Sequence, residues 1–274
     1  VGLVPLHCLL DAGKYFLEKQ RRSTGVSEAE LIRIAVKSMG LDELAPFDPK
    51  KKIIEYQLQE QEGKRLIDMN LVAFANETAS ESPAPGGGSI SAYMGALGAA
   101  LGTMVANLSS HKKGWDERWQ YFGDYAAKGQ QIKDELLRLV DEDTASFNNI
   151  MDAFALPKSN DTEKTHRSEA IQAATLYATE VPLRTMKVCY SAFPLVAAMI
   201  AEGNPNSITD AAVGALCLRS AIYGAALNVQ INASGLKDKE KAAQLSAEAE
   251  ELLLQAKSEE EELLKLTRSK MGIA

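Results

Sequence analysis

The chain has 274 residues, a hydrophobic content of 46%, an aromatic content of 6% and a formal net charge of −7. The apolar residues are therefore mostly Ala, Leu, Ile, Val and Met, which favours closely packed helices. The negative charge gives no electrostatic basis for binding nucleic acid or an anionic membrane, so neither partner is expected. The three cysteines lack Cys-x-x-Cys spacing and the three histidines lie far apart. We therefore expect free thiols, a reducing cytoplasmic location and no metal site.

Residues 1–58 are expected to form a small separate unit. It has an amphipathic helix over 6–20, then a helix that the capping box Ser27-Glu-Ala-Glu30 opens, and a short helix over 50–58. This unit offers little apolar surface for a core of its own, so we interpret it as a remnant or an arm that packs on something else. Residues 59–65, rich in Gln and Glu, are expected to be a linker.

From residue 66 to the C-terminus the pattern is helical throughout, and no stretch alternates as a strand would. Pro182 either kinks a helix or lies in the first turn of a new one. The sequence predicts an all-α, up-and-down bundle with one long central helix and no substantial sheet. The expected helices cover 66–78, 89–110, 115–154, 161–179, 182–199, 207–233 and 237–270.

The stretch Ser82-Pro-Ala-Pro-Gly-Gly-Gly-Ser-Ile90 cannot continue a helix and predicts a corner between two helices. Ser89 is expected to be the N-cap of the second helix, with glycine amides open to an anion or a polar ring edge. A tight loop without a ligand explains the glycines equally well. Because the uncharged run 83–110 is rich in Pro, Gly and Ser, we interpret it as a buried helix and not as a membrane span.

Small residues recur three and four apart in the helix after this corner, at Gly95, Gly98 and Gly102. We call these three residues the glycine stripe. Such a stripe allows another helix to approach closely, either from the same chain or from a second copy.

Polar residues in apolar helices are the candidates for chemistry. Asn228 and Asn232 share a helix face and need either a ligand or interhelical hydrogen bonds. Asp143 lies at or beside the apolar stripe of the long helix, where burial would raise its pKa and suit it to proton exchange. A solvated acid is the alternative. Lys158, at a corner, could pair with an acidic ligand tail, and Asp210 is explained as the acid of a second capping box, Ser207-Ile-Thr-Asp210.

Several motifs occur in one order along the chain: Pro85-Gly-Gly-Gly-Ser89, Leu139-Val-Asp-Glu-Asp143 with Phe147, Leu156-Pro-Lys158, Gly203-Asn204, Asp210 and Asn228-Val-Gln-Ile-Asn232. Together they resemble the cyclodeaminase domain of the formimidoyltransferase-cyclodeaminase family and its stand-alone relatives, the methenyltetrahydrofolate cyclohydrolases. Residues 1–56 resemble the end of that family's formimidoyltransferase C-terminal subdomain. The transferase's N-terminal subdomain is not represented, so we do not expect this chain to transfer formimino groups by itself.

This resemblance implies conversion of 5-formimidoyltetrahydrofolate to 5,10-methenyltetrahydrofolate and ammonia, a step of histidine degradation and one-carbon metabolism, without metal or redox cofactor. It implies that Asp143 carries the proton and that a folate, with or without a polyglutamate tail, is the substrate. It further implies a homodimer or larger homo-oligomer formed through helices, which the glycine stripe would suit. The folate-binding residues expected from position and chemistry are Pro85, Gly86, Gly87, Gly88, Ser89, Lys158, Asn204, Asp210, Asn228 and Asn232.

Two other functions fit the same sequence. One is hydrolysis of methenyltetrahydrofolate in the same pocket, with water as the nucleophile. The other is a helical oligomerisation module without catalytic activity.

Overall fold

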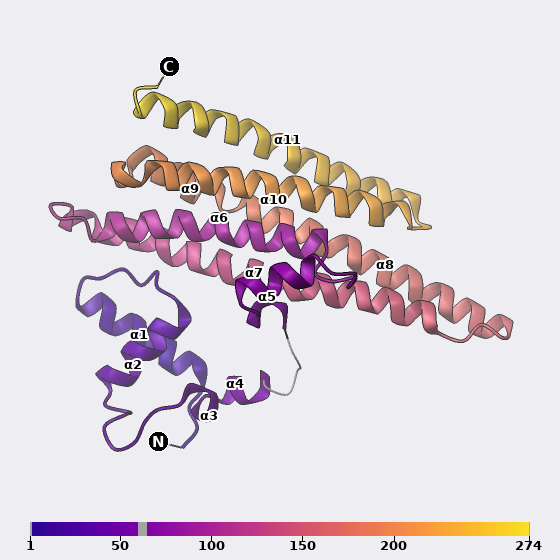
Figure 1. The fold of residues 1–274 in the computed structure, drawn as a ribbon, viewed down its shortest axis with the longest axis horizontal. Helices are drawn as coiled ribbons and strands as arrows, with labels where there is room; N and C mark the ends of the chain where they lie inside the picture. The colour runs from indigo at the N-terminus through magenta and orange to yellow at the C-terminus, as the bar shows by residue number, and fades with distance from the viewer. Residues whose placement is uncertain (1, 60–64, 274) are drawn as a thin grey trace.

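The computed structural model describes residues 2–59 and 65–273 (Figure 1). Within these ranges the chain is helical, and the one extended pairing is an isolated parallel bridge between Val4 and Ile53. This confirms the predicted all-α class. The elements are α1 (Leu6–Lys19), α2 (Glu28–Ser38), α3 (Pro49–Lys52), α4 (Ile54–Gln59), η1 (Leu66–Asp68), α5 (Leu71–Thr78), α6 (Gly87–Ser110), η2 (Asp116–Arg118), α7 (Trp119–Ala155), α8 (Asp161–Tyr190), α9 (Phe193–Glu202), η3 (Pro205–Ser207), α10 (Ile208–Ser234) and α11 (Lys239–Lys270).

Five long helices form the bundle, in which α6 packs against α7 and α10, and α10 also packs against α8 and α11. Figure 1 shows them lying side by side with alternating direction. Their contact faces are built largely from Ala and Gly, with larger apolar groups such as Phe122, Leu136 and Phe193 fully buried between them. Small contact residues let helix axes approach closely, which explains the low aromatic content of the sequence.

The glycine stripe is covered by helices of the same chain. A Cβ atom added to Gly95 would lie 2.3 Å from the Sγ of Cys189, and one added to Gly98 would lie 2.9 Å from the carbonyl oxygen of Gly214. A Cβ on Gly102 would lie 2.9 Å from the Cγ of Leu195. The expectation that this stripe forms a dimer contact is therefore wrong, because α8, α9 and α10 already occupy it.

Several helix boundaries differ from the sequence-based expectation, and three of these differences bear on the predicted caps and on Pro182. The helix expected to start at Ser89 starts at Gly87, with Gly86 as its N-cap, so Ser89 lies inside the first turn. Helix α8 continues through Pro182 to Tyr190, so the idea of a new helix at Pro182 is wrong. The Ser207–Asp210 capping box does not form, because Ser207 ends the turn η3 and its side chain makes no capping bond.

By length and composition alone, α6, the segment Asp161–Glu202 and the segment Pro205–Ser234 could each cross a membrane. In the fold, the buried residues of α6 include most of its Ala and Gly residues and several of its hydroxyl side chains. A buried helix is what the Pro, Gly and Ser content of this run predicted.

The N-terminal unit has a small core of its own around Leu9, Ile32 and Ile53. The N-cap half of the predicted capping box is present, since the Ser27 Oγ accepts a hydrogen bond from the Glu30 backbone amide at 3.3 Å, but the Glu30 carboxylate pairs with Arg33. The helix expected over 50–58 is divided into α3 and α4 at Ile53, where the chain pairs with Val4. The predicted linker 59–65 lies almost wholly outside the described residues.

The segment Ser23–Ser27 of this unit packs against the helical bundle. The carbonyl oxygen of Gly25 accepts hydrogen bonds from the Nδ2 of Asn107, at 2.6 Å, and from the Nε2 of Gln130, at 3.1 Å. Gly25 is buried, and a Cβ atom there would lie 2.2 Å from the Cβ of Ala126. Only glycine allows the segment to lie this close to α6 and α7.

Candidate active site

The first turn of α6 meets the middle of α7 at Asp143. The Ser89 hydroxyl donates a hydrogen bond to the Oδ2 of Asp143 at 2.9 Å, and Ser89 has no exposed surface. A Cβ atom on Gly88 would lie 2.1 Å from the Oδ1 of Asp143. The carboxylate therefore occupies the space that any side chain at position 88 would need. Thr144 adds a hydroxyl, with its Oγ1 3.3 Å from the Oγ of Ser89.

Burial raises the pKa of the Asp143 carboxyl above its ordinary value of 3.8, while hydrogen bonds from the Ser89 side chain and backbone act in the opposite direction. Desolvation is the largest of these effects, because a carboxylate away from water loses its favourable hydration. The protonated form is thus easier to reach here than in an exposed Asp. This is the environment expected for a group that takes up and releases a proton during a reaction.

The glycine corner was expected either to be open to an anion or a polar ring edge or to be a tight loop without a ligand. In the structure, the anion at the start of α6 is the chain's own Asp143 carboxylate, which accepts a hydrogen bond from the Ser89 backbone. A negative group at this position is favoured by the helix dipole and by the free amides of the first turn. Pro85 and Gly88 are buried, whereas Gly87 is exposed beside them. Of these corner residues, Gly87 offers its backbone to solvent at the site.

The two asparagines of α10 have different surroundings. Asn228 lies beside the corner, since a Cβ atom on Gly87 would be 3.3 Å from its Nδ2, which donates to the carbonyl oxygen of Gly224. Asn232 donates from its Nδ2 to the carbonyl oxygen of Ala178 at 2.7 Å, which ties α10 to α8. The structure therefore groups Asn228 with Asp143 and gives Asn232 an interhelical hydrogen bond.

Three predicted ligand residues lie away from this group within the chain. The backbone amide of Asn204 donates a hydrogen bond to the Oγ of Ser109, at the C-terminal end of α6. Asp210 lies close by, in the first turn of α10. At about 1.5 Å per residue, that end of α6 is roughly 30 Å from its start. Lys158 is exposed at the turn between α7 and α8, some way along the chain from Asp143. This chain alone does not bring these residues together with Asp143, so their roles stay predictions.

Some neighbours of the site were not identified from the sequence. Ser91 donates from its Oγ to the carbonyl oxygen of Gly87 at 2.7 Å and so fixes the corner. Its position, four residues after Gly87 in a helix, is the signal that could have indicated this bond.

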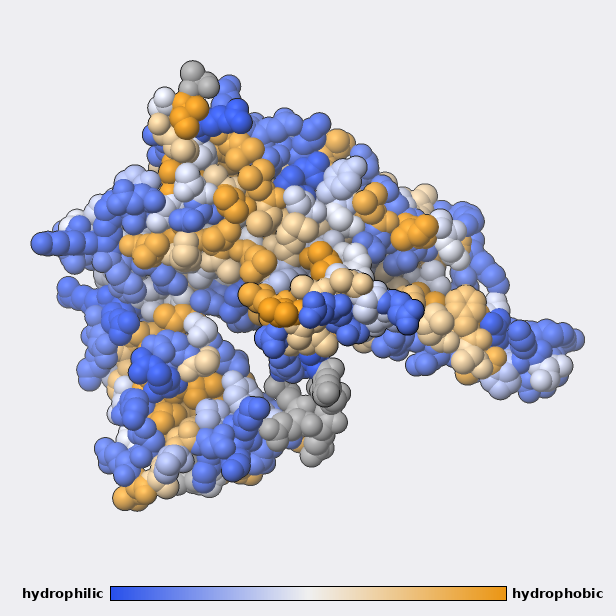
Figure 2. All heavy atoms as spheres, viewed as in Figure 1, coloured by the Kyte–Doolittle hydropathy of each residue, from blue (hydrophilic) through white to orange (hydrophobic). Residues whose placement is uncertain are grey.

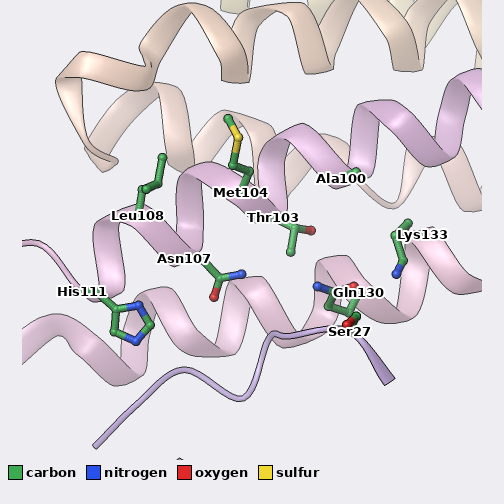
Figure 3. Close-up of a pocket in the computed structure, with 9 residues that line it drawn as sticks. All are labelled: Ser27, Ala100, Thr103, Met104, Asn107, Leu108, His111, Gln130 and Lys133. Carbon is green, nitrogen blue, oxygen red and sulfur yellow. The ribbon is translucent and has the colours of Figure 1, made fainter. Parts of the chain in front are cut away.

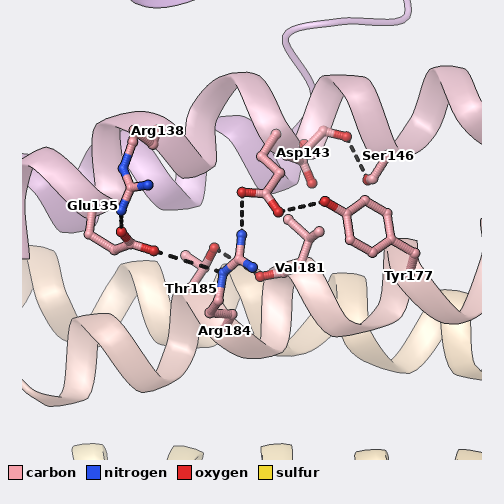
Figure 4. Close-up of polar contacts among 9 residues, drawn as sticks. Glu135, Arg138, Asp143, Ser146, Tyr177, Val181, Arg184 and Thr185 are labelled. Carbon is pink, nitrogen blue, oxygen red and sulfur yellow. Dashed lines mark hydrogen bonds and ion pairs between the residues drawn. The ribbon is translucent and has the colours of Figure 1, made fainter.

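A polar network beside the site was also not identified from the sequence. Glu142 accepts a hydrogen bond from the Tyr177 hydroxyl at 2.6 Å and pairs with Arg184, which also approaches Glu135. Figure 4 shows Tyr177 and Arg184 of α8 directed at the carboxylates of α7. The Tyr177 and Arg184 interactions hold the pKa of Glu142 below its ordinary value although burial acts against them. Glu142 therefore fixes α7 against α8, and its neighbour Asp143 is left facing α6.

Asp141 has a third orientation. Its Oδ1 accepts a hydrogen bond from the Leu66 amide at 2.6 Å, which anchors the start of η1. Three consecutive acids of α7 thus contact three different parts of the fold, and only Asp143 meets the glycine corner.

A cavity of about 550 Å³ lies elsewhere, between the Ser23–Ser27 segment and helices α6 and α7 (Figure 3). Several of its polar groups are engaged with the chain, whereas the Oδ1 of Asn107 and the Oε1 of Gln130 are buried without a hydrogen-bond partner. Asn107 and Gln130 hold Gly25, the Nε2 of His111 lies 3.3 Å from the Ser23 amide, and Lys133 pairs with Asp134. This cavity marks the joint between the two units and is not the site around Asp143.

Comparison with known proteins assigns the chain to a family. A family profile described as formiminotransferase-cyclodeaminase matches residues 70–251, which is more than half of the chain. The chain belongs to the formiminotransferase-cyclodeaminase family. A second profile, described as the formiminotransferase domain, matches residues 1–59. The site residues Gly87, Ser89, Asp143 and Asn228 of this chain all lie inside the first match.

The individual relatives are of two lengths. Formimidoyltransferase-cyclodeaminase of Gallus gallus is 35% identical over 258 residues, which cover 94% of this chain and 48% of the relative. The chain therefore spans about half the length of this relative. Methenyltetrahydrofolate cyclohydrolase of Methylorubrum extorquens is 37% identical over 199 residues, which cover 73% of this chain and 96% of the relative.

A solved structure has the same fold. Formiminotetrahydrofolate cyclodeaminase of Thermotoga maritima superposes with a TM-score of 0.65 at 24% identity, over 73% of this chain and 96% of that one. At this identity the likeness supports the helical architecture alone. It agrees with the up-and-down bundle expected from the sequence.

Proposed function

We propose that this chain is a formimidoyltetrahydrofolate cyclodeaminase, which releases ammonia and forms 5,10-methenyltetrahydrofolate. The observation that carries this proposal is the Asp143 carboxyl, which lies half-buried beside the α6 corner, where desolvation raises its pKa. One of its oxygens is bonded to Ser89, and the other faces the corner without a side chain in front of it, because residue 88 is glycine.

The reaction needs two proton movements, and a single carboxyl at this position can perform both. N10 of the folate attacks the carbon of the protonated formimino group (N5–CH=NH2+) and loses its proton to the Oδ1 of Asp143, which gives a neutral tetrahedral carbon bearing an amino group. The carboxylic acid then returns the proton to that nitrogen, which leaves as ammonia as the methenyl bridge forms. Such general acid–base catalysis needs a pKa closer to neutrality than that of an exposed Asp, and burial acts in that direction.

The surrounding residues support binding of a flat polar ring. Under this proposal, Gly86, Gly87 and Asn228 offer backbone and amide groups to the pterin and formimino atoms, and Ser89 keeps the Asp143 carboxylate in place. Pro85 and Gly88 shape the corner from within. Direct ligand roles for Asn204, Asp210 and Asn232 require either a second copy of the chain or a shift of these groups, and we give them lower priority.

We further propose that a second copy of the chain packs on the outer face of α6 and α10. Exposed large apolar side chains recur three, four and seven residues apart along both helices, and Figure 2 shows apolar residues gathered where these helices reach the surface. α6 carries no charged residue, so a self-complementary apolar partner fits this face. The residues are Leu97, Met104, Leu108, Val213, Leu216, Tyr223, Leu227 and Ile231.

A measurement of mass in solution tests this partner. Sedimentation of wild type should give a dimer or larger assembly, and Leu227→Glu should lower the mass to that of one chain. A monomeric wild type would contradict the proposal.

A turnover assay tests the activity. The chain is incubated with 5-formimidoyltetrahydrofolate while ammonia and the absorbance of the methenyl product are followed together. Wild type should release both in equal amounts, and Asp143→Asn should be slower by about 10²- to 10⁴-fold, the range for loss of a general acid–base group. Unchanged turnover in Asp143→Asn would refute the assignment.

Methenyltetrahydrofolate cyclohydrolase activity is the second candidate. It is favoured by the Methylorubrum extorquens relative, which this chain matches over 96% of that protein's length. The same pocket would use water as the nucleophile. Loss of methenyl absorbance without ammonia release separates this activity from the first.

For the whole protein, the match of residues 1–59 to the formiminotransferase domain supports association with a transferase activity, and we propose a role in histidine breakdown on this basis. We also propose a reducing cytoplasmic location, supported by three free cysteines, of which Cys189 is buried.

A further inference from the structure

The apolar stripe of α7 continues beyond the N-terminal end of α6, the helix that packs against it. Up to Val140 this stripe is fully buried, with Leu136 and Leu139 having no exposed surface. Beyond Asp143 the same pattern is exposed, and its large side chains have no helix over them. Figure 1 shows the hairpin of α7 and α8 extending beyond the N-terminal end of α6.

Three residues form this exposed continuation, which we call the arm stripe: Phe147, Met151 and Phe154. Their exposed fractions are 39%, 52% and 50%. They follow Asp143 by four, eight and eleven residues, so all of them share its helix face. Because Asp143 faces the first turn of α6, the arm stripe faces the space directly beyond that turn.

On its other faces, this part of α7 packs within the fold. Ser146 is buried and donates from its Oγ to the carbonyl oxygen of Asp143, and Ala153 is buried at 6% exposure. The arm is therefore a regular part of the fold, and the exposure of three adjacent large apolar groups is confined to one face. An apolar strip of this kind on an otherwise polar hairpin usually marks a contact surface.

We propose that the arm stripe binds the p-aminobenzoyl-glutamate part of the folate, with the reacting carbon at Asp143. This inference rests on the cyclodeaminase function proposed above. The p-aminobenzoyl ring lies along Phe147 and Met151, and the glutamate reaches the end of the stripe at Phe154.

Length and chemistry support this occupant. From Asp143 to Phe154 the helix rises about 16 Å, which suits an extended molecule and exceeds the size of one ring. Two aromatic rings and a flexible thioether make a surface on which a flat aromatic group packs well. The N10 atom joins the p-aminobenzoyl ring to the pterin, so a ring on Phe147 places the reacting nitrogen one helix turn away, near Asp143.

Two cationic side chains lie at the far end of the stripe, next to the acidic first turn of α8 with Asp161 and Glu163. The Arg167 guanidinium lies 5.4 Å from the centre of the Phe154 ring and donates to the Phe154 carbonyl oxygen, and Lys158 is exposed at the adjoining turn. The two carboxylates of the glutamate would meet these cationic groups, whereas the uncharged p-aminobenzoyl ring needs no ionic partner. The order of carboxylic acid and aromatic surface along α7, followed by cations in the turn and in α8, matches the order of reacting carbon, ring and glutamate in the substrate.

Binding measurements with two probes test the inference. The first probe is 5-formyltetrahydrofolate, and the second is 6-methyltetrahydropterin, which lacks the p-aminobenzoyl-glutamate part. Calorimetric titration of Phe147→Leu and Phe154→Leu should give a dissociation constant for the first probe about three- to tenfold above that of wild type. Affinity for the second probe should stay within about twofold. The matched control is Asp152→Asn, an exposed residue on another face of the same arm, which should bind both probes as wild type does.

The inference would be overturned if both Phe variants bound 5-formyltetrahydrofolate as tightly as wild type, or if their affinity for both probes fell to the same extent. It would also be overturned if the Phe variants had a lower molecular mass in solution than wild type, because this would show that a second copy of the chain packs on the stripe. Ammonia release by wild type is measured in parallel. If wild type releases ammonia while the Phe variants bind normally, only the arm stripe assignment fails. If wild type neither binds the folate probe nor releases ammonia, the proposed function fails and this inference fails with it.

Discussion

Substitution of Gly88 by alanine tests how the α6 corner and Asp143 depend on each other. The added Cβ would lie 2.1 Å from the Oδ1, 2.5 Å from the Cγ and 2.7 Å from the Oδ2 of Asp143. These separations are far below van der Waals contact, so one group has to move. The carboxylate is the end of a rotatable side chain, whereas residue 88 belongs to a packed helix. We therefore expect the carboxylate to swing away and its 2.9 Å hydrogen bond with Ser89 to break.

The expected effect is large on turnover and small on stability. A displaced carboxylate removes general acid–base catalysis, which is worth about 10²- to 10⁴-fold in rate. Loss of a hydrogen bond to a charged group costs about 1.5 to 3 kcal/mol at most, and renewed hydration of the carboxylate offsets part of this. Gly88→Ala should thus fold with a nearly unchanged helical spectrum and release ammonia at a rate close to that of Asp143→Asn.

A matched control lies two residues earlier. A Cβ atom on Gly86 would have the Pro83 carbonyl oxygen at 3.7 Å, an ordinary contact, and the backbone of Gly86 is extended. Gly86→Ala should therefore keep most of the activity. The double variant Gly88→Ala with Asp143→Asn should be no slower than the slower single variant, because both changes remove the same group.

The assay is steady-state ammonia release from 5-formimidoyltetrahydrofolate, with circular dichroism and thermal melts on each variant. If Gly88→Ala retains turnover within about twofold of wild type, less than 0.5 kcal/mol of the barrier depends on the carboxylate at this position. Such a result would refute the argument that the absence of a side chain at residue 88 makes room for the reacting group.

Three further predictions concern other parts of the fold. The pKa of Asp143 is raised in the folded chain, so the folded state binds this proton more tightly than the unfolded state, and the free energy of unfolding contributed by Asp143 falls as pH rises from 3.8 through the folded-state pKa. Denaturant titrations should find Asp143→Asn stabilised relative to wild type at neutral pH and not below pH 3.8; an equal difference at both pH values would contradict this. Gly25→Val, whose Cβ would lie 2.2 Å from that of Ala126, should cost about 1 to 3 kcal/mol and speed proteolysis between residues 20 and 27, with ammonia release unchanged. A proteolysis rate equal to that of wild type would show that this segment does not need to lie close to α6 and α7. Asn232→Ala should lower stability by about 1 to 2 kcal/mol through loss of its bond to Ala178, without changing KM, whereas Asn228→Ala should raise KM. A raised KM in Asn232→Ala would return that residue to the binding site.

Periodicity of apolar residues was sufficient to predict the bundle. The helix over 115–154 and the helix over 237–270 were found within a few residues as α7 and α11, because long amphipathic patterns leave little choice. The break between α8 and α9 was missed. The residues there are apolar on both sides of Ser191, and their pattern does not show where one helix ends and the next begins.

The site was harder to predict than the helices. The polar partner of Ser89 is Asp143, 54 residues away, and no local pattern contains that contact. Ser89 resembled an N-cap because its hydroxyl follows three glycines, but the helix starts two residues earlier and leaves the hydroxyl free for α7. Phe147 continues the spacing of the buried stripe of α7, yet 39% of it is exposed. The sequence of α7 carries no signal for the point at which α6 begins opposite it.

The contact between Gly88 and Asp143 also limits where residues can be inserted into this chain or deleted from it. One residue inserted into α6 between Ser89 and the glycine stripe would leave the stripe packed on α8, α9 and α10. It would turn the start of the helix by about 100° and shift it by about 1.5 Å, so that Gly88 would no longer face the carboxylate. The same insertion in the loop before Pro83 would leave this register intact. Natural variation in length should therefore collect before the corner and be absent from the first two turns that follow it.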